Sequence, residues 1–245
     1  MLTSPHFSAG AGSETLVGNL RENLEQTRTR IASAATRWGR APESIGLMAV
    51  SKTQPAERIR ALAEHGQRDF GENYLQEALS KISALEDLRL TWHFIGQVQA
   101  NKTRAVAERF QWVHTVDRER IAVRLSDQRP HYAPALNICI QVRFEDEPGK
   151  GGVRPQEAGA LARCVRDLPR LKLRGLMCIP PPRTSFEEQH AFFAQLAALQ
   201  GELIAQGLQL DTLSMGMSAD LEAAVAAGAT WVRIGTAIFG ERTQQ

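Results

Sequence analysis

Lys52 is the residue in this sequence best suited to covalent chemistry. It ends an apolar run that begins at Leu47. The chain has 29 lysines and arginines, but lysine occurs only at Lys52, Lys81, Lys102, Lys150 and Lys172. An arginine stays protonated, whereas a desolvated lysine can lose its proton and attack a carbonyl. Lys52 is therefore a candidate for Schiff-base formation; the alternative is an ordinary solvated charge at the end of a strand.

A second group of residues suits an anion. It follows two predicted strands, at residues 212–215 and 231–234. Ser218 is expected to be the N-cap of the next helix, where unpaired backbone N–H groups attract anions. Gly235 permits close approach of the backbone, and Thr236 adds a hydroxyl. These loops predict a phosphate site, although two ordinary capped turns would have the same residues.

Two carboxylates lie close to this predicted phosphate site. Asp220 and Glu222 suit the start of a helix but would repel a dianion. Their side chains are therefore expected to point away from the phosphate.

A reactive lysine and a phosphate site together indicate two chemistries. One is that of a Schiff-base aldolase or a similar sugar-phosphate enzyme. The other is the binding of pyridoxal 5′-phosphate, which a lysine and a phosphate site can hold together. The residues alone leave both open.

The elements that must position these residues alternate along the chain. After one long amphipathic helix that starts near Ser13, short apolar runs alternate with helical periods. The predicted strands are 45–50, 69–70, 92–95, 112–115, 136–142, 173–179, 212–215 and 231–234. The predicted helices between them are 56–65, 75–84, 102–109, 118–125, 155–167, 186–205 and 219–227.

Eight strand–helix alternations predict an α/β fold, a (β/α)₈ TIM barrel with an extra N-terminal helix. An open doubly wound sheet is the alternative, but no GxGxxG motif follows the first strand. In such barrels the functional residues lie at the carboxyl ends of the strands. His93 and His114 are expected there as polar walls of the pocket, without metal-ligand spacing.

The bulk composition excludes several classes of protein. A net charge of +2 in 245 residues does not indicate a nucleic-acid partner, and no segment is long and apolar enough to predict a membrane span. Three cysteines without CxxC spacing fit a reducing compartment. Residues 1–12 lack the order of a signal peptide and are expected to form a flexible leader. The remainder, 13–245, is expected to be one cytoplasmic domain, and a monomer because no exposed apolar stripe stands out.

Several motifs resemble those of a known family. The segments AVSK at 49–52, FGENY at 70–74, HFIG at 93–96, GLM at 175–177, MGMSAD at 215–220 and RIGTAIFG at 233–240 closely resemble the YggS/PROSC family of pyridoxal phosphate homeostasis proteins. Lys102 and Lys150 also occupy motif positions, whereas Lys81 and Lys172 are expected to be surface charges. The resemblance extends from about Gly46 to Gly240, and it implies a barrel like the N-terminal domain of alanine racemase.

The resemblance also implies roles for individual residues. It places the Schiff base on Lys52, Asn73 beside the cofactor and Arg233 against its pyridine nitrogen. It assigns the phosphate to the segment of Met217 and Ser218 and to Gly235 and Thr236. Two positions depart from the family. Gly151 replaces the usual serine, which weakens any role implied for the Lys150 loop. Cys178 replaces the usual alanine, which is expected to be a tolerated packing change, although a thiol there could add to a nearby aldehyde.

The same residues bear on whether the chain is an enzyme or a carrier. A protonated Arg233 keeps the ring nitrogen unprotonated, so the cofactor is a poorer electron sink. The resemblance implies that a racemase would need a second base, supplied by a tyrosine of an added domain. This sequence has only Tyr74 and Tyr132 and ends at Gln245. We therefore expect storage, buffering or delivery of pyridoxal phosphate, with apo-enzymes as recipients; the alternative is a racemase of narrow or weak activity.

Overall fold

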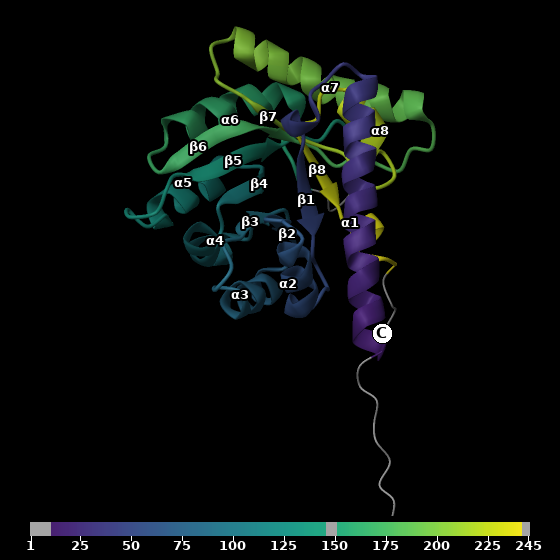
Figure 1. Ribbon diagram of the computed structural model, residues 1–245. Helices are drawn as coiled ribbons and strands as arrows, with labels where there is room; N and C mark the ends of the chain where they lie inside the picture. The colour runs from purple at the N-terminus through teal and green to yellow at the C-terminus, as the bar shows by residue number, and fades with distance from the viewer. Residues whose placement is uncertain (1–10, 146–150, 242–245) are drawn as a thin grey trace, which may run out of the picture.

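Eight parallel strands form a closed barrel in the computed structural model, which describes residues 11–145 and 151–241 (Figure 1). The strands follow one another around the barrel in sequence order, and β1 closes it by pairing with β8. They are β1 Gly46–Val50, β2 Asp69–Glu72, β3 Thr91–Phe94, β4 Trp112–Val116, β5 Leu136–Gln141, β6 Leu171–Met177, β7 Thr212–Ser214 and β8 Trp231–Ile234. The predicted TIM barrel is confirmed.

Helices cover the outside of the barrel and bury its apolar surface. The helices that follow the strands are α2 Ala56–Glu64, α3 Leu75–Ala84, α4 Thr103–Arg109, α5 Glu119–Gln128, α6 Pro155–Asp167, α7 Phe186–Ala205, α8 Leu221–Ala226 and α9 Thr236–Phe239. Two short 3₁₀ turns, Pro42–Ser44 and Ala100–Lys102, precede β1 and α4. One continuous cluster of buried apolar side chains lies between strands and helices. In the two described stretches, no helix is both long and apolar enough to span a bilayer.

The first helix, α1 Ala11–Arg37, runs along the outside of the barrel and packs on α2, α8 and α9 (Figure 1). Arg30 forms an ion pair with Glu222 of α8 at 2.9 Å. The Asn23 side chain donates to the carbonyl of Ile238 in α9 at 3.0 Å. The extra helix therefore supports the two elements that follow β7 and β8.

Some predicted boundaries were wrong by a few residues. Helix α1 begins at Ala11, so that Ser13, near which it was expected to start, lies inside its first turn. Helix α8 begins at Leu221 with Asp220 as its N-cap residue, so Ser218 does not cap it. Strand β6 ends at Met177 and leaves Cys178 beyond it. Residues 1–10, which make up most of the predicted leader, lie outside the described part.

Candidate functional site at the barrel mouth

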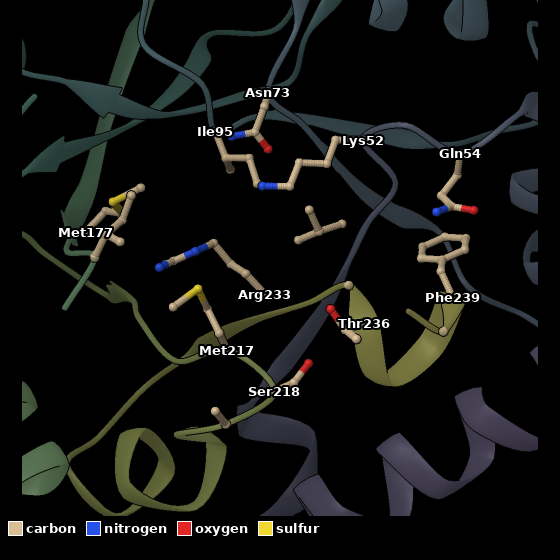
Figure 2. A pocket seen from close by; sticks show the side chains of 15 residues that line it. Lys52, Gln54, Asn73, Ile95, Met177, Met217, Ser218, Arg233, Thr236 and Phe239 are labelled. Carbon is tan, nitrogen blue, oxygen red and sulfur yellow. The ribbon is translucent and has the colours of Figure 1, made fainter. Parts of the chain in front are cut away.

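A cavity of about 390 Å³ lies at the carboxyl ends of the strands. This volume is in the range of about 300–1,000 Å³ typical of small-molecule sites. The cavity lining includes every residue that the sequence singled out for cofactor binding: Lys52, Asn73, Met217, Ser218, Arg233, Gly235 and Thr236. In Figure 2 the side chains of Lys52, Asn73 and Arg233 come together on one side of it, and Ser218 and Thr236 lie across from Lys52. The fold thus brings the predicted lysine and the predicted phosphate loops to one space.

A buried ionic cluster fixes the backbone on both sides of Lys52. The Lys81 amine donates to the Ser51 carbonyl at 2.6 Å and pairs with Glu72 at 2.7 Å. The Ser51 hydroxyl donates to the same Glu72 oxygen at 2.6 Å. On the other side of Lys52, the Thr53 N–H donates to Glu77, which also pairs with Lys81. Thr53 has a φ of 66°, a strained value for a β-branched residue, so these contacts fix an otherwise unfavourable turn.

The sequence did not reveal this cluster, and Lys81, expected to be a surface charge, is only 5% exposed. Burial raises the pKa of Glu72, and the hydrogen bonds from Lys81 and Ser51 oppose that rise. The Glu77–Lys81 spacing of four residues was a visible signal of a helical ion pair. The tertiary partner, Glu72, was not apparent from spacing.

Asn73 follows β2 and faces the cavity with an unsatisfied atom. Its side-chain oxygen is buried, and among the described residues it has no hydrogen-bond partner. A side chain at Gly96 would place its Cβ 2.0 Å from the Asn73 carbonyl oxygen. Glycine there lets the ends of β2 and β3 approach and holds Asn73 at the cavity.

The phosphate loops are tied to each other and to α1. The Ser218 hydroxyl accepts from the Ala237 N–H at 3.4 Å, and the Ser218 carbonyl accepts from Arg30 at 3.2 Å. The Asp220 carboxylate accepts from the Met217 N–H, and Glu222 pairs with Arg30. Glu222 is therefore engaged by α1, whereas Asp220 bonds within the predicted phosphate segment itself. Burial raises the pKa of Asp220, and the Met217 N–H opposes that rise.

Arg233 is buried in the floor of the cavity. It is 4% exposed, and burial lowers the pKa of its guanidinium. It donates to the Ser214 carbonyl at 2.7 Å, the Ser214 hydroxyl at 3.0 Å and the Cys178 carbonyl at 2.9 Å. Within the described residues no carboxylate forms an ion pair with it. A strand-end ion pair, the ordinary explanation for such an arginine, is therefore not what holds it.

Two histidines that were expected in the wall of the cavity lie elsewhere. His93 and His114 do not line the cavity: both are fully buried inside the barrel, where His93 bonds to Asp69 and His114 to Ser214. Cys178 is fully buried and does not line the cavity, in agreement with the expected packing change, and burial raises its pKa to about 12, which disfavours addition to an aldehyde.

Two other residues that the sequence singled out, Lys150 and Tyr74, are not seen at the cavity. Lys150 lies outside the described residues. Tyr74 is 59% exposed and is absent from the cavity lining. In the part of the chain that the structure describes, no group of three metal-ligating side chains is placed to hold an ion.

Comparison with known proteins agrees with this geometry. Residues 17–243 match the family model of the alanine racemase N-terminal domain. The chain is 56% identical over 226 residues to the pyridoxal phosphate homeostasis protein of Pseudomonas aeruginosa, covering 92% of this chain and 97% of that one. It is 52% identical over 229 residues to the protein of the same name in Escherichia coli, with coverage of 92% and 98%.

A solved structure supports the same family relationship. PipY of Synechococcus elongatus, solved with PLP bound, superimposes with a TM-score of 0.80 at 39% identity, covering 90% of this chain and all of PipY. The chain therefore belongs to the alanine racemase N-terminal domain family and, within it, to the pyridoxal phosphate homeostasis proteins.

Proposed function

We propose that this protein binds pyridoxal 5′-phosphate reversibly and serves to store, buffer or deliver it. The observation that carries the proposal is that Lys52 lines the same cavity as Ser218, Gly235 and Thr236. A nucleophilic amine and a phosphate site at opposite sides of one cavity match a ligand with an aldehyde and a phosphate. PipY, at 39% identity, was solved with this ligand.

Each residue has a distinct task in this proposal. The neutral amine of Lys52 adds to the aldehyde and a water molecule leaves; water reverses the step and releases the cofactor. Ser218, Gly235 and Thr236 bind the phosphate, with Met217 beside them. The buried oxygen of Asn73 has no protein partner in the described residues, which fits a polar ligand next to it. Arg233 faces the pyridine nitrogen.

A carrier fits these residues better than a racemase does. A bound pyridoxal phosphate acts as an electron sink for carbanion chemistry, and it is a stronger sink when its ring nitrogen is protonated. Arg233 is a permanent donor and disfavours that proton. No tyrosine stands among the described residues that line the cavity. Met217 and Ile179 at its edge are 38% and 36% exposed, so the cofactor can exchange with solvent or with a recipient apo-enzyme. We place this monomeric carrier in the cytoplasm.

The test is to load the protein with pyridoxal phosphate, reduce it with borohydride and weigh the peptides. The wild type and the control variant Lys172→Ala, which lacks an exposed lysine, should carry the label on Lys52. Lys52→Ala should carry none. Label on another lysine, or no label on the wild type, would overturn the proposal.

The racemase alternative has its own test. The wild type and Lys52→Ala are incubated with a panel of amino acids in deuterated water. Exchange of the α-proton by the wild type alone would establish catalysis, whereas no exchange supports the carrier.

A further inference from the structure

A row of hydrogen-bonded polar side chains crosses the inside of the barrel. It starts at Asp69, where β2 begins, and ends at Arg233, where the cavity begins. Asp69 contacts His93 Nε2 at 2.9 Å, and His93 Nδ1 contacts His114 Nε2 at 3.0 Å. His114 Nδ1 contacts the Ser214 hydroxyl at 2.9 Å, and that hydroxyl accepts from Arg233 at 3.0 Å.

The carboxylate at one end and the guanidinium at the other fix the direction of every bond. A carboxylate only accepts, so His93 must donate from Nε2, and in a neutral ring its Nδ1 then accepts from His114 Nε2. His114 Nδ1 is left as an acceptor for the Ser214 hydroxyl proton. The Ser214 oxygen in turn accepts from Arg233, which can only donate. Each bond therefore points from Arg233 toward Asp69.

The surroundings favour neutral imidazoles in this row. His93 and His114 are 0% exposed, and Trp112 stacks on both rings at centroid distances of 5.5 Å. Burial lowers the pKa of both histidines, that of His114 well below its ordinary value. Asp69 is the one member of the row whose side chain is partly exposed, at 29%.

Such a row is expensive inside a barrel, which is usually filled with branched apolar side chains. Burial of a polar group costs free energy unless the group is hydrogen-bonded. In this row both ring nitrogens of each histidine and the Ser214 hydroxyl have a partner in the neighbouring member. Its visible effect is on Arg233. Of the five guanidinium N–H donors, Nη1 uses two on Ser214 and Nη2 uses one on Cys178. One Nη2 proton and the Nε proton remain for a ligand.

We propose that Asp69, His93, His114 and Ser214 are positioning residues that orient the Arg233 guanidinium toward the ring nitrogen of the bound cofactor. This inference rests on the proposed function, which places Arg233 at that nitrogen. The row acts through Arg233 and does not touch the cofactor. Polarised by the Asp69 carboxylate, it holds the arginine in one rotamer and strengthens Ser214 as its acceptor.

The first test needs no cofactor. Nitrogen-15 NMR of the imidazoles in the unliganded protein should show His93 and His114 as neutral rings that are protonated at Nε2. Protonation of His114 at Nδ1 would reverse the row and overturn the inference. Because no ligand is present, this result does not depend on whether the proposed function holds.

The second test separates positioning of Arg233 from a general structural effect. Affinity is measured for pyridoxal phosphate and for its analogue with a C–H group in place of the ring nitrogen. Ser214→Ala should bind pyridoxal phosphate about tenfold more weakly, as expected for the loss of a hydrogen bond to a charged group. It should bind the analogue as the wild type does. The control Ser126→Ala removes another buried hydroxyl, which donates to the Pro169 carbonyl, and should change neither affinity.

A milder variant guards against misfolding of Ser214→Ala. Asp69→Asn removes the charge at the exposed end and should weaken only the binding of pyridoxal phosphate, by less than Ser214→Ala does. Equal losses for both ligands, or no loss in either variant, would overturn the inference. A wild type that binds neither ligand would instead refute the proposed function.

Discussion

Replacing Lys81 by methionine tests the ionic cluster beneath Lys52. The substitution keeps the length of the side chain but removes the cation that pairs with Glu72 at 2.7 Å. Glu72 is 0% exposed, and one of its oxygens already has no partner among the described residues. Loss of one member of a buried ion pair costs about 3–5 kcal/mol, because the remaining charge is left uncompensated. We expect the free energy of unfolding to fall by that amount at pH 7.

The loss should depend on pH in a defined direction. Burial already raises the pKa of Glu72, and the hydrogen bond from Lys81 is the largest effect that opposes the rise. Without Lys81 the folded-state pKa rises further above the unfolded value. A carboxyl with a raised pKa favours folding below its unfolded pKa and loses that contribution as the pH rises through its folded pKa. The deficit of Lys81→Met relative to wild type should therefore be larger at pH 7 than at pH 5.

Urea unfolding at both pH values gives the measurement, with Lys172→Met as the exposed-lysine control. The double variant Glu72→Gln/Lys81→Met removes the orphaned charge and should recover most of the loss. A cost below about 1 kcal/mol for Lys81→Met would place the pair in the range of solvent-exposed salt bridges and refute the reasoning. The reasoning would also be refuted if the loss in the free energy of unfolding were equal at both pH values and unchanged when Glu72→Gln is added.

Two further predictions concern packing and cysteine reactivity. Gly96→Ala should lower the free energy of unfolding by about 1–3 kcal/mol, because its Cβ would meet the Asn73 carbonyl at 2.0 Å. Gly201→Ala, in a helix with nothing within 4 Å of the new Cβ, should raise the free energy of unfolding by about 0.5–1 kcal/mol. Thermal unfolding of both variants is the measurement, and similar effects of the two substitutions would be inconsistent with this reasoning. A thiol reagent should modify the partly exposed Cys164 before Cys178, which is fully buried with a pKa raised to about 12; mass spectrometry of native and unfolded protein tests the order, and Cys178 reacting first would be incompatible with the structure.

The sequence predicted the barrel because the alternation of elements is a local pattern. It also predicted the mouth residues, since all carboxyl ends of parallel strands lie at the same face. Lys52, Ser218 and Arg233 could be placed there without any knowledge of contacts. The structure brings these three to one cavity.

The positions of His93, His114 and Lys81 could not be obtained in that way. Alternation along β3 indicates that His93 points inward, opposite to Trp92 and Phe94, but not how deep it lies. Depth depends on the register of neighbouring strands, such as Gly71 opposite His93. Lys81 was misjudged because its main partner, Glu72, lies on strand β2 and not on helix α3, which carries Lys81, so that the two side chains meet only after the helix packs on the barrel.

The contacts of α1 with α8 and α9 have a consequence for how the protein is made. Asn23 near the start of the chain is bonded to Ile238 near its other end, and β1 needs β8 as a neighbour. Residues up to Ile238 must therefore have left the ribosome before the barrel can close and bring Lys52 and Thr236 to one cavity. A nascent chain that still lacks β8 has neither the closed barrel nor this cavity.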